Sequence, residues 1–210
     1  MKKRLIISAI NQKGGSGKST TIFQLSGTML IQGYSPLVLL DLDPQGSLSG
    51  TWARKVANYP VEVIHNPGIK IKDPIFKSTA SMLIDAAPND PQAVRLCLAV
   101  SNIALVPVKS SPYDLDSSLP ILEMAKEARG AVNPGLKLLW VFNQVKQNTV
   151  AFRDIRDHAI KRGLPVARAF IPDSILLVES IIKKLPLCYI NRKHLINQFY
   201  KNLLKEIEKL

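Results

Sequence analysis

Cysteine, acidic residues and long apolar runs are all scarce in this sequence of 210 residues. Its two cysteines, Cys97 and Cys188, lie among apolar neighbours and form no Cys-x-x-Cys pair, which predicts reduced core residues of a reducing compartment. No run of about eighteen apolar residues is present, so no stable membrane insertion is expected. There is also no apolar signal-peptide core followed by a cleavage site, and we therefore expect a cytoplasmic protein.

The shortage of acidic residues leaves the chain with a strong positive charge. Sixteen Asp and Glu stand against 28 Lys and Arg, for a net charge of +12, which is high for a metabolic enzyme. The excess is larger towards the C-terminus, where the residues from Lys146 onward hold thirteen Lys and Arg against six Asp and Glu. Apolar residues make up 46% of the chain, so we expect a folded core rather than disorder.

Strand-like and helix-like segments alternate along the whole chain. Apolar runs predict strands at Leu5–Ile10, Leu37–Leu40, Val61–Ile64, Ser81–Asp85, Ile103–Val108, Leu138–Asn143 and Val166–Phe170. Helices are expected at about Ser19–Gln32, Ser47–Arg54, Asp90–Val100, Ser117–Arg129, Val150–Arg162, Ser174–Lys184 and Lys193–Leu210. Residues 66–80 are predicted to be mostly loop, with a short helical stub. This alternation predicts one α/β domain over residues 1–210, with a doubly wound, mostly parallel sheet and helices on both faces.

The segment with the clearest chemical meaning is Gln12–Ser19, which follows the first apolar run. Its three glycines let the backbone wrap closely around an anion, with N–H groups pointing inward. The Lys18 ammonium suits the β- and γ-phosphates of a nucleotide, and the Ser19 hydroxyl suits Mg²⁺. A helix that starts here would turn the positive end of its dipole towards the same phosphates. The general P-loop pattern is incomplete, because Gln12 stands at the place of its first glycine and Lys13 is an additional cation.

Aspartates close two further apolar runs. One run ends in Asp41-Leu42-Asp43-Pro44-Gln45, and strand alternation places Asp41 and Asp43 on the same side. Another run ends at Asp85, as a Walker B strand does. Carboxylates at the carboxyl ends of parallel strands, beside a phosphate loop, suit Mg²⁺ and a water nucleophile. Without the phosphate loop, the same aspartates would be interpreted as caps or solvated loop residues.

These motifs together resemble the ParA/MinD family of P-loop ATPases, whose deviant Walker A loop reads Lys-Gly-Gly-x-Gly-Lys-Thr/Ser. The resemblance implies ATP and Mg²⁺ as cofactors, weak hydrolysis that a partner stimulates, and a homodimer formed on ATP binding. It makes Lys13, Lys18 and Asp43 catalytic, with Lys13 reaching the partner's nucleotide and Asp43 orienting the attacking water. It places Ser19, Asp41 and Asp85 at the metal. The residues expected to bind the nucleotide are Gly14, Gly15, Ser16, Gly17, Lys18, Ser19, Thr20, Asn143 and Pro172.

Two of these assignments concern the adenine base. Asn143, at the end of a predicted strand, matches the asparagine that hydrogen-bonds adenine in the family. Pro172 lies in Ile171-Pro172-Asp173, which resembles the loop that closes the other side of the base. The alternative for Asn143 is a strand-end asparagine that bonds its own backbone. The missing Cys-x-x-Cys pair argues against the iron–sulfur scaffold branch of the family.

The C-terminal charge yields a second candidate site. In ParA-like proteins, basic residues of this part bind DNA without sequence preference in the ATP-bound dimer, and phosphate contacts of this kind supply affinity without sequence reading. The residues that match are Lys183, Lys184, Arg192 and Lys193. Each could equally be a solvated helix end. The resemblance thus implies a nucleoid-associated DNA-partitioning ATPase, with non-specific DNA and a hydrolysis-stimulating, centromere-binding protein as partners.

Three other functions are also compatible with the sequence motifs. A MinD-like ATPase would bind membranes through the amphipathic last helix, whose cationic face Glu206 and Glu208 weaken. An ATPase of conjugative DNA transfer would carry the same motifs as a partition protein. A metabolic enzyme resembling dethiobiotin synthetase would use the same fold on a small substrate, but the Asp-Pro-Gln turn and the basic excess disfavour it.

Overall fold

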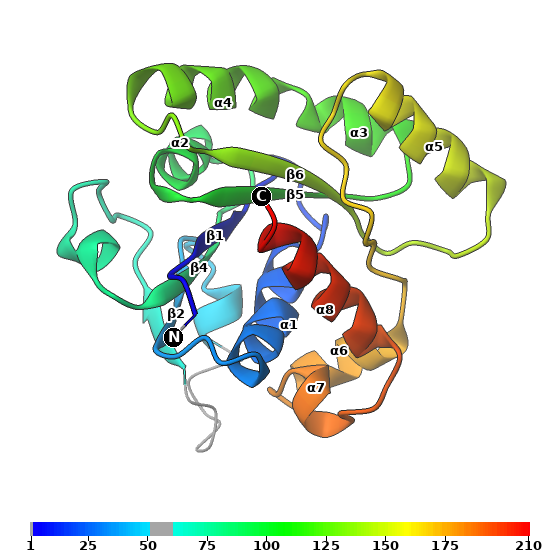
Figure 1. The fold of residues 1–210 in the computed structure, drawn as a ribbon, viewed down its shortest axis with the longest axis horizontal. Coiled ribbons are helices and arrows are strands. Elements are labelled where there is room, and N and C mark those ends of the chain that lie inside the picture. Colours follow the sequence, from blue (N-terminus) through cyan, green and yellow to red (C-terminus); the bar gives the residue numbers. More distant parts are fainter. Residues whose placement is uncertain (1, 51–60) are drawn as a thin grey trace.

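One sheet of six parallel strands runs through the protein, with helices on both of its faces (Figure 1). The structure is a computed structural model that describes residues 2–50 and 61–210. The strands lie in the order β3-β2-β4-β1-β5-β6, and every neighbouring pair is parallel. They are β1 (Ile6–Ala9), β2 (Leu37–Asp41), β3 (Glu62–His65), β4 (Ser81–Asp85), β5 (Ile103–Val108) and β6 (Lys137–Phe142). The predicted doubly wound α/β class is confirmed.

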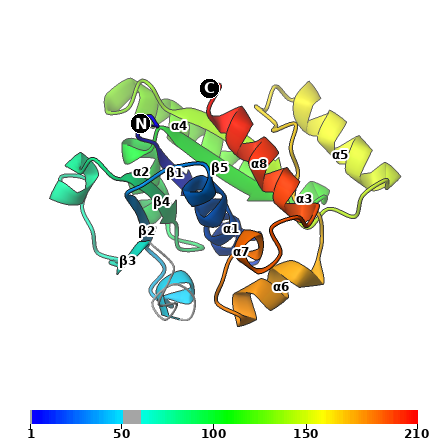
Figure 2. The same cartoon turned by 60° about the horizontal axis from the view of Figure 1, so that its bottom comes forward.

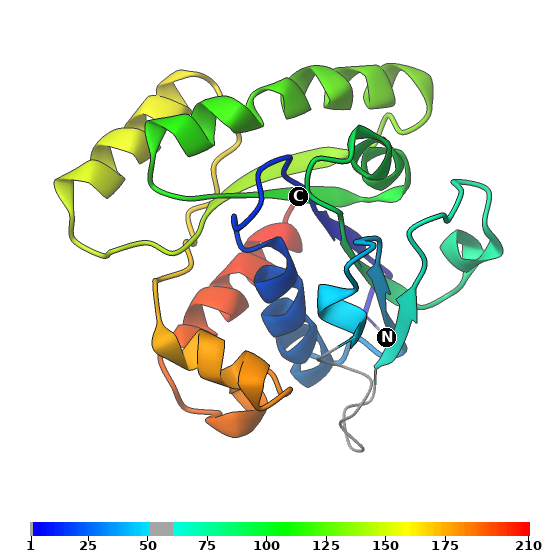
Figure 3. The same ribbon diagram turned by 180° about the vertical axis from the view of Figure 1, so that it is seen from behind.

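The helices divide between the two faces of the sheet, as Figure 1 and the reverse view in Figure 3 show. One face carries α2 (Pro91–Val100), α3 (Pro112–Ser118), α4 (Pro120–Ala131) and α5 (Val150–Lys161). The other carries α1 (Lys18–Ile31), α6 (Ile175–Ile182), α7 (Leu187–Ile190) and α8 (Ile196–Ile207). Each face has its own buried apolar cluster, one including Trp140 and Phe152 and the other Phe23 and Tyr200. Because both faces are covered, the central strands β1, β2, β4 and β5 are buried throughout, which explains their continuous apolar sequences.

Residues 66–80 contain only a 3₁₀ helix at Pro74–Lys77, so the predicted short stub is confirmed near its expected place. Asp73 caps this helix by accepting a hydrogen bond from the backbone N–H of Ile75. The helix expected over Ser47–Arg54 lies partly outside the described residues, and the chain is helical from 47 to 50.

Two sequence-based expectations are wrong. The helix expected at Ser117–Arg129 is two helices, α3 and α4, because Pro120 lacks an N–H and starts a new helix at its first position. The strand expected at Val166–Phe170 is irregular and touches β6 through a single bridge, Trp140 to Val166. The Glu206 carboxylate of α8 accepts hydrogen bonds from the N–H groups of Arg168 and Ala169, at 2.8 and 2.7 Å. Those donors are therefore unavailable for a strand ladder.

Helix α1 links the phosphate loop to the C-terminal helices, as the tilted view in Figure 2 makes visible. The side-chain amide of Gln24, which is 2% exposed, donates to the Ser180 hydroxyl on α6. Its carbonyl accepts from the backbone N–H of Leu187 on α7, at 2.8 Å. At Gly27, a Cβ atom would lie 2.6 Å from Cβ of Pro186 and 2.7 Å from Sγ of Cys188. The close approach of α7 to α1 therefore depends on glycine at this position.

Gly27→Ala should destabilise the protein by about 1–3 kcal/mol, because the added methyl group must displace the backbone or side chains of a packed contact. The measurement is urea unfolding followed by circular dichroism. Gly130→Ala on α4 is the matched control, since a Cβ there meets nothing within 4 Å. That control should raise stability by about 0.5–1 kcal/mol through helix propensity. Equal effects of the two variants would contradict the packing argument.

Candidate functional site

The loop between β1 and α1 has the backbone geometry of an anion-binding turn. Gly15 and Gly17 have positive φ angles of 70° and 89°, which glycine adopts without strain. Gly17 caps α1, so the free N–H groups and the positive end of the helix dipole face this loop. Lys18 is the first residue of α1 and only 6% exposed, and its ammonium donates to the Lys13 carbonyl at 3.3 Å. Burial lowers the pKa of Lys18, while Asp85 and Asp43 oppose the shift.

Asn143, the residue that follows β6, supports this loop. Its side-chain amide donates to the Ser16 carbonyl at 3.0 Å, and its side-chain carbonyl accepts from the N–H of Gln144 at 2.9 Å. A Cβ on Gly17 would lie 1.9 Å from this amide nitrogen, so the contact also requires glycine in the loop. Pro172 is buried nearby, in a bridge with Val145. Of the two adenine candidates, Asn143 thus contacts the loop and braces it, whereas Pro172 pairs with Val145, two residues beyond Asn143.

Asp41 is the last residue of β2 and Asp43 lies in the loop after it, so strand alternation does not apply to this pair. Asp41 and Asp85 end neighbouring strands and are register partners. Both carboxylate oxygens of Asp41 accept backbone hydrogen bonds, from Asp43 at 3.0 Å and from Ser49 at 2.8 Å. Asp41 therefore orients the loop that carries Asp43, which is itself partly exposed. The metal role assigned to Asp41 stays a prediction.

Asp85 has the properties of a carboxylate that faces a bound cation shell. It is 1% exposed, and among residues 2–50 and 61–210 no hydrogen bond of regular geometry reaches either of its oxygens, although the Ser19 hydroxyl is near enough to influence it. Burial raises the pKa of Asp85 to about 7; Asp41 and Asp43 add to the rise, and Ser19 and Lys18 oppose it. In the described part of the chain, no three His, Cys, Asp or Glu side chains converge as a metal group. The assignment of Ser19 and Asp85 to Mg²⁺, an ion that commonly binds through few carboxylates together with waters and nucleotide phosphates, stays a prediction.

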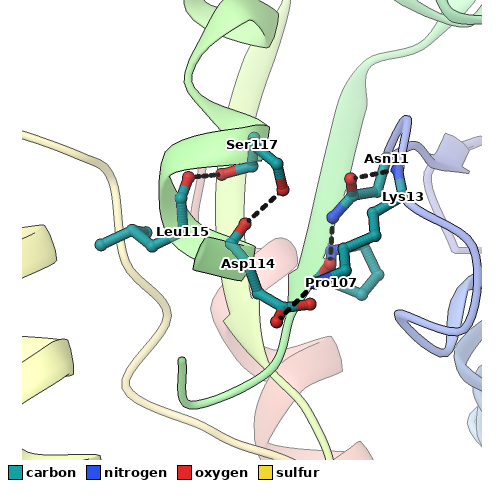
Figure 4. Close-up of polar contacts among 7 residues, drawn as sticks. Asn11, Lys13, Pro107, Asp114, Leu115 and Ser117 are labelled. Carbon is teal, nitrogen blue, oxygen red and sulfur yellow. Dashed lines mark hydrogen bonds and ion pairs between the residues drawn. The ribbon is translucent and has the colours of Figure 1, made fainter. Parts of the chain in front are cut away.

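Lys13 is held by an acidic partner that the sequence analysis did not identify. Figure 4 shows its ammonium against Asp114 of α3, at 2.9 Å from Oδ2. The Lys13 side chain is 44% exposed, whereas that of Asp114 is 7% exposed. Asn11 fixes the start of the loop, because its side chain accepts from the Lys13 N–H and donates to the Pro107 carbonyl. Asp114 is 101 residues from Lys13, so no local pattern could have indicated the pair.

The four candidate DNA-binding residues lie at the junctions of the C-terminal helices. Lys183 is the C-terminal cap of α6 and Lys184 follows it, while Arg192 and Lys193 lie between α7 and α8. Lys183, Arg192 and Lys193 are exposed, and Lys184 is half-buried. Within residues 2–50 and 61–210, no ion pair neutralises any of the four. We call these four residues the basic corner.

Helix α8 packs as part of the core. Tyr200, Leu203, Leu204 and Ile207 are at most 2% exposed and belong to the apolar cluster of the α1 face. Its last acidic residue, Glu208, pairs with Lys2 at 2.7 Å and accepts from the Tyr34 hydroxyl at 2.9 Å. No helix in the described part of the chain has the length and apolarity to cross a membrane.

A parallel α/β sheet with a phosphate loop at the carboxyl end of β1, and carboxylates at the ends of β2 and β4, defines a P-loop ATPase. The family model for the CobQ/CobB/MinD/ParA nucleotide binding domain matches residues 7–187. The chain belongs to this family of nucleotide-binding domains.

The proteins that are similar to this chain in sequence or fold have names that refer to different functions. The maintenance of carboxysome distribution protein A of Halothiobacillus neapolitanus is 30% identical over 173 residues, which is 78% of this chain and 77% of that protein. The chromosome-partitioning ATPase Soj of Thermus thermophilus is 28% identical over 167 residues, covering 64% and 67%. The cobyrinic acid a,c-diamide synthase of Mycobacterium smegmatis, solved with an ATP analog and magnesium, has a TM-score of 0.76 at 18% identity, covering 97% and 94%.

Proposed function

We propose that this protein is a DNA-partitioning ATPase, which forms an ATP-sandwich dimer and binds DNA without sequence preference. In this proposal a centromere-binding partner stimulates hydrolysis, and the DNA-bound dimer associates with the nucleoid. The observation that carries the proposal is the basic corner, four cations at the junctions of the C-terminal helices that have no ion-pair partner among the described residues. Unpaired cations on a surface suit the DNA backbone, which supplies affinity without a sequence code.

Lys13 supports the dimer. Lys18 already provides a buried cation inside the loop, so a monomeric phosphate site has no evident need for a second one on the outside. Lys13 keeps nearly half of its side chain exposed, and a single ion pair with Asp114 holds it. A long, exposed cation at the mouth of the site is suited to reach a nucleotide bound by a second copy.

The packing of α8 supports DNA rather than membrane as the surface that the protein binds. Most of the apolar residues that a membrane-binding helix would present are buried in the cluster of the α1 face, while Leu195 and Leu210 at the two ends are exposed. Glu206 and Glu208 are committed to contacts within the protein. A MinD-like function would therefore require α8 to leave its core position.

Replacing Lys184, Arg192 and Lys193 together with glutamate should remove DNA binding and leave ATP-driven dimerisation intact, because these residues lie outside the phosphate loop. The measurement is fluorescence anisotropy with random duplex DNA in the presence of ATP, of ADP and of no nucleotide. For the wild type with ATP, affinity should fall with salt, with a log–log slope of about −0.9 per neutralised phosphate.

The matched control changes the exposed Lys70, Lys72 and Lys77, beside the edge strand β3, to glutamate, so that the change in net charge is the same. This variant should keep most of its DNA binding. Equal DNA affinity in all three nucleotide states, or equal losses in the two triple variants, would reject the basic corner as the ATP-gated surface. Binding to anionic vesicles in place of DNA would favour the membrane alternative.

A further inference from the structure

A lysine that the sequence analysis did not single out lies against the phosphate loop. Lys109 directly follows β5, the strand that runs beside β1. Its ammonium nitrogen is 4.0 Å from the position that a Cβ on Gly15 would occupy. Gly15 is one of the two loop glycines with positive φ, so Lys109 reaches the part of the loop whose backbone is shaped for an anion.

The polypeptide around Lys109 is held firmly to the loop. The N–H of Ile10 donates to the Leu105 carbonyl at 2.9 Å, which extends the contact between β1 and β5. The buried Asn11 side chain then donates to the Pro107 carbonyl at 2.7 Å, as Figure 4 shows. These contacts fix the backbone from which the Lys109 side chain extends, and so hold it within reach of the loop.

The charge on Lys109 has no acidic partner. In residues 2–50 and 61–210, no carboxylate lies within ion-pair distance of its ammonium, although the side chain is half-buried. The acid in the neighbouring helix, Asp114, is engaged with Lys13. A cation that is partly withdrawn from water and unpaired, beside inward-facing N–H groups, is an arrangement that a bound anion stabilises.

We propose that Lys109 is a second positioning cation for the phosphate tail of the bound nucleotide, and that it acts on the nucleotide of its own chain. Lys18 contacts the phosphates from within the loop, and Lys109 contacts them from the end of β5. Its contribution grows with the number of phosphate charges, because each charge adds to the attraction. This role rests on the ATP site and is independent of the proposed binding of DNA.

The test compares nucleotide affinities rather than turnover. Lys109→Met keeps the length of the side chain and removes its charge, and Lys109→Gln is a second variant in case the first folds poorly. Competition against a fluorescent nucleotide gives the Kd of AMP, ADP and a slowly hydrolysed ATP analog. The protein is kept at a concentration at which sedimentation shows a monomer, which excludes contributions from a partner. Lys161→Met on α5, an exposed lysine, is the matched control.

We expect Lys109→Met and Lys109→Gln to raise the Kd of the ATP analog about tenfold, which corresponds to the loss of one charge-assisted hydrogen bond. The affinity for ADP should fall less, and the affinity for AMP should be nearly unchanged. Lys109→Arg should restore the preference for the triphosphate. Lys161→Met should match the wild type. Unchanged affinities in the Lys109 variants would overturn the proposal, as would equal losses for AMP, ADP and the ATP analog, which would indicate a purely structural role.

Discussion

Lys18→Ala should weaken the binding of Mg²⁺–ATP by about 100-fold or more, the loss expected when charge-assisted hydrogen bonds to two phosphates disappear. Lys18 is the cation that the fold buries most deeply at the loop, where water screens its charge little. Isothermal titration calorimetry would measure the loss, and thermal unfolding without nucleotide would confirm that the variant folds.

Lys2→Ala is a suitable control, because it also removes one lysine but acts at the surface pair with Glu208. It should bind ATP like the wild type. If Lys18→Ala bound ATP within a factor of three of the wild type, the loop geometry described here would not be the phosphate site.

Lys13→Ala should keep ATP binding and lose ATP-driven dimerisation, if the exposed ammonium bridges to a second copy. The experiment is sedimentation with Mg²⁺ and ATP, performed in an Asp43→Ala background that is expected to slow hydrolysis. The parent with Lys13 should double in mass, and the variant should remain a monomer.

A second variant separates the two consequences of losing Lys13. Removing the lysine leaves the nearly buried Asp114 carboxylate without its ion-pair partner, which alone destabilises the local fold. Lys13→Ala combined with Asp114→Ala removes that carboxylate too, and it should still be a monomer. Recovery of the dimer in the double variant would show that the unpaired carboxylate, and not a missing bridge, caused the loss.

The sequence predicts the parts of the site that local chemistry determines. A glycine-rich turn after a buried strand and aspartates at strand ends are short-range patterns, and the sheet brings Asp41 and Asp85 together through the parallel register of β2 and β4. The parallel direction of the strands is predicted in the same way, since helices between strands require parallel crossovers, whereas the strand order comes from the structure. The bounds predicted for the strands that carry the loop and these aspartates agree with β1, β2 and β4 within a few residues.

The parts that the sequence does not predict depend on partners far along the chain. Asp114 pairs with Lys13, which lies 101 residues earlier in the sequence. Asn143 donates to the carbonyl of Ser16, which lies 127 residues earlier. Segment Val166–Phe170 has the apolar character of a strand, but Glu206 captures two of its N–H donors. Each outcome is decided by tertiary contacts that override local propensity.

The contact of Gln24 with α6 and α7 bears on how the molecule opens locally. If α6 and α7 detached from α1 together, the buried Gln24 amide would lose both of its partners, Ser180 and Leu187, at a cost of about 1–3 kcal/mol for each group left unsatisfied. Fluctuations that expose α7 are therefore coupled to the helix that begins at Lys18. We therefore expect the start of α1 and helix α7 to open together, so that nucleotide that stabilises the start of α1 also slows hydrogen exchange at the backbone amides of α7.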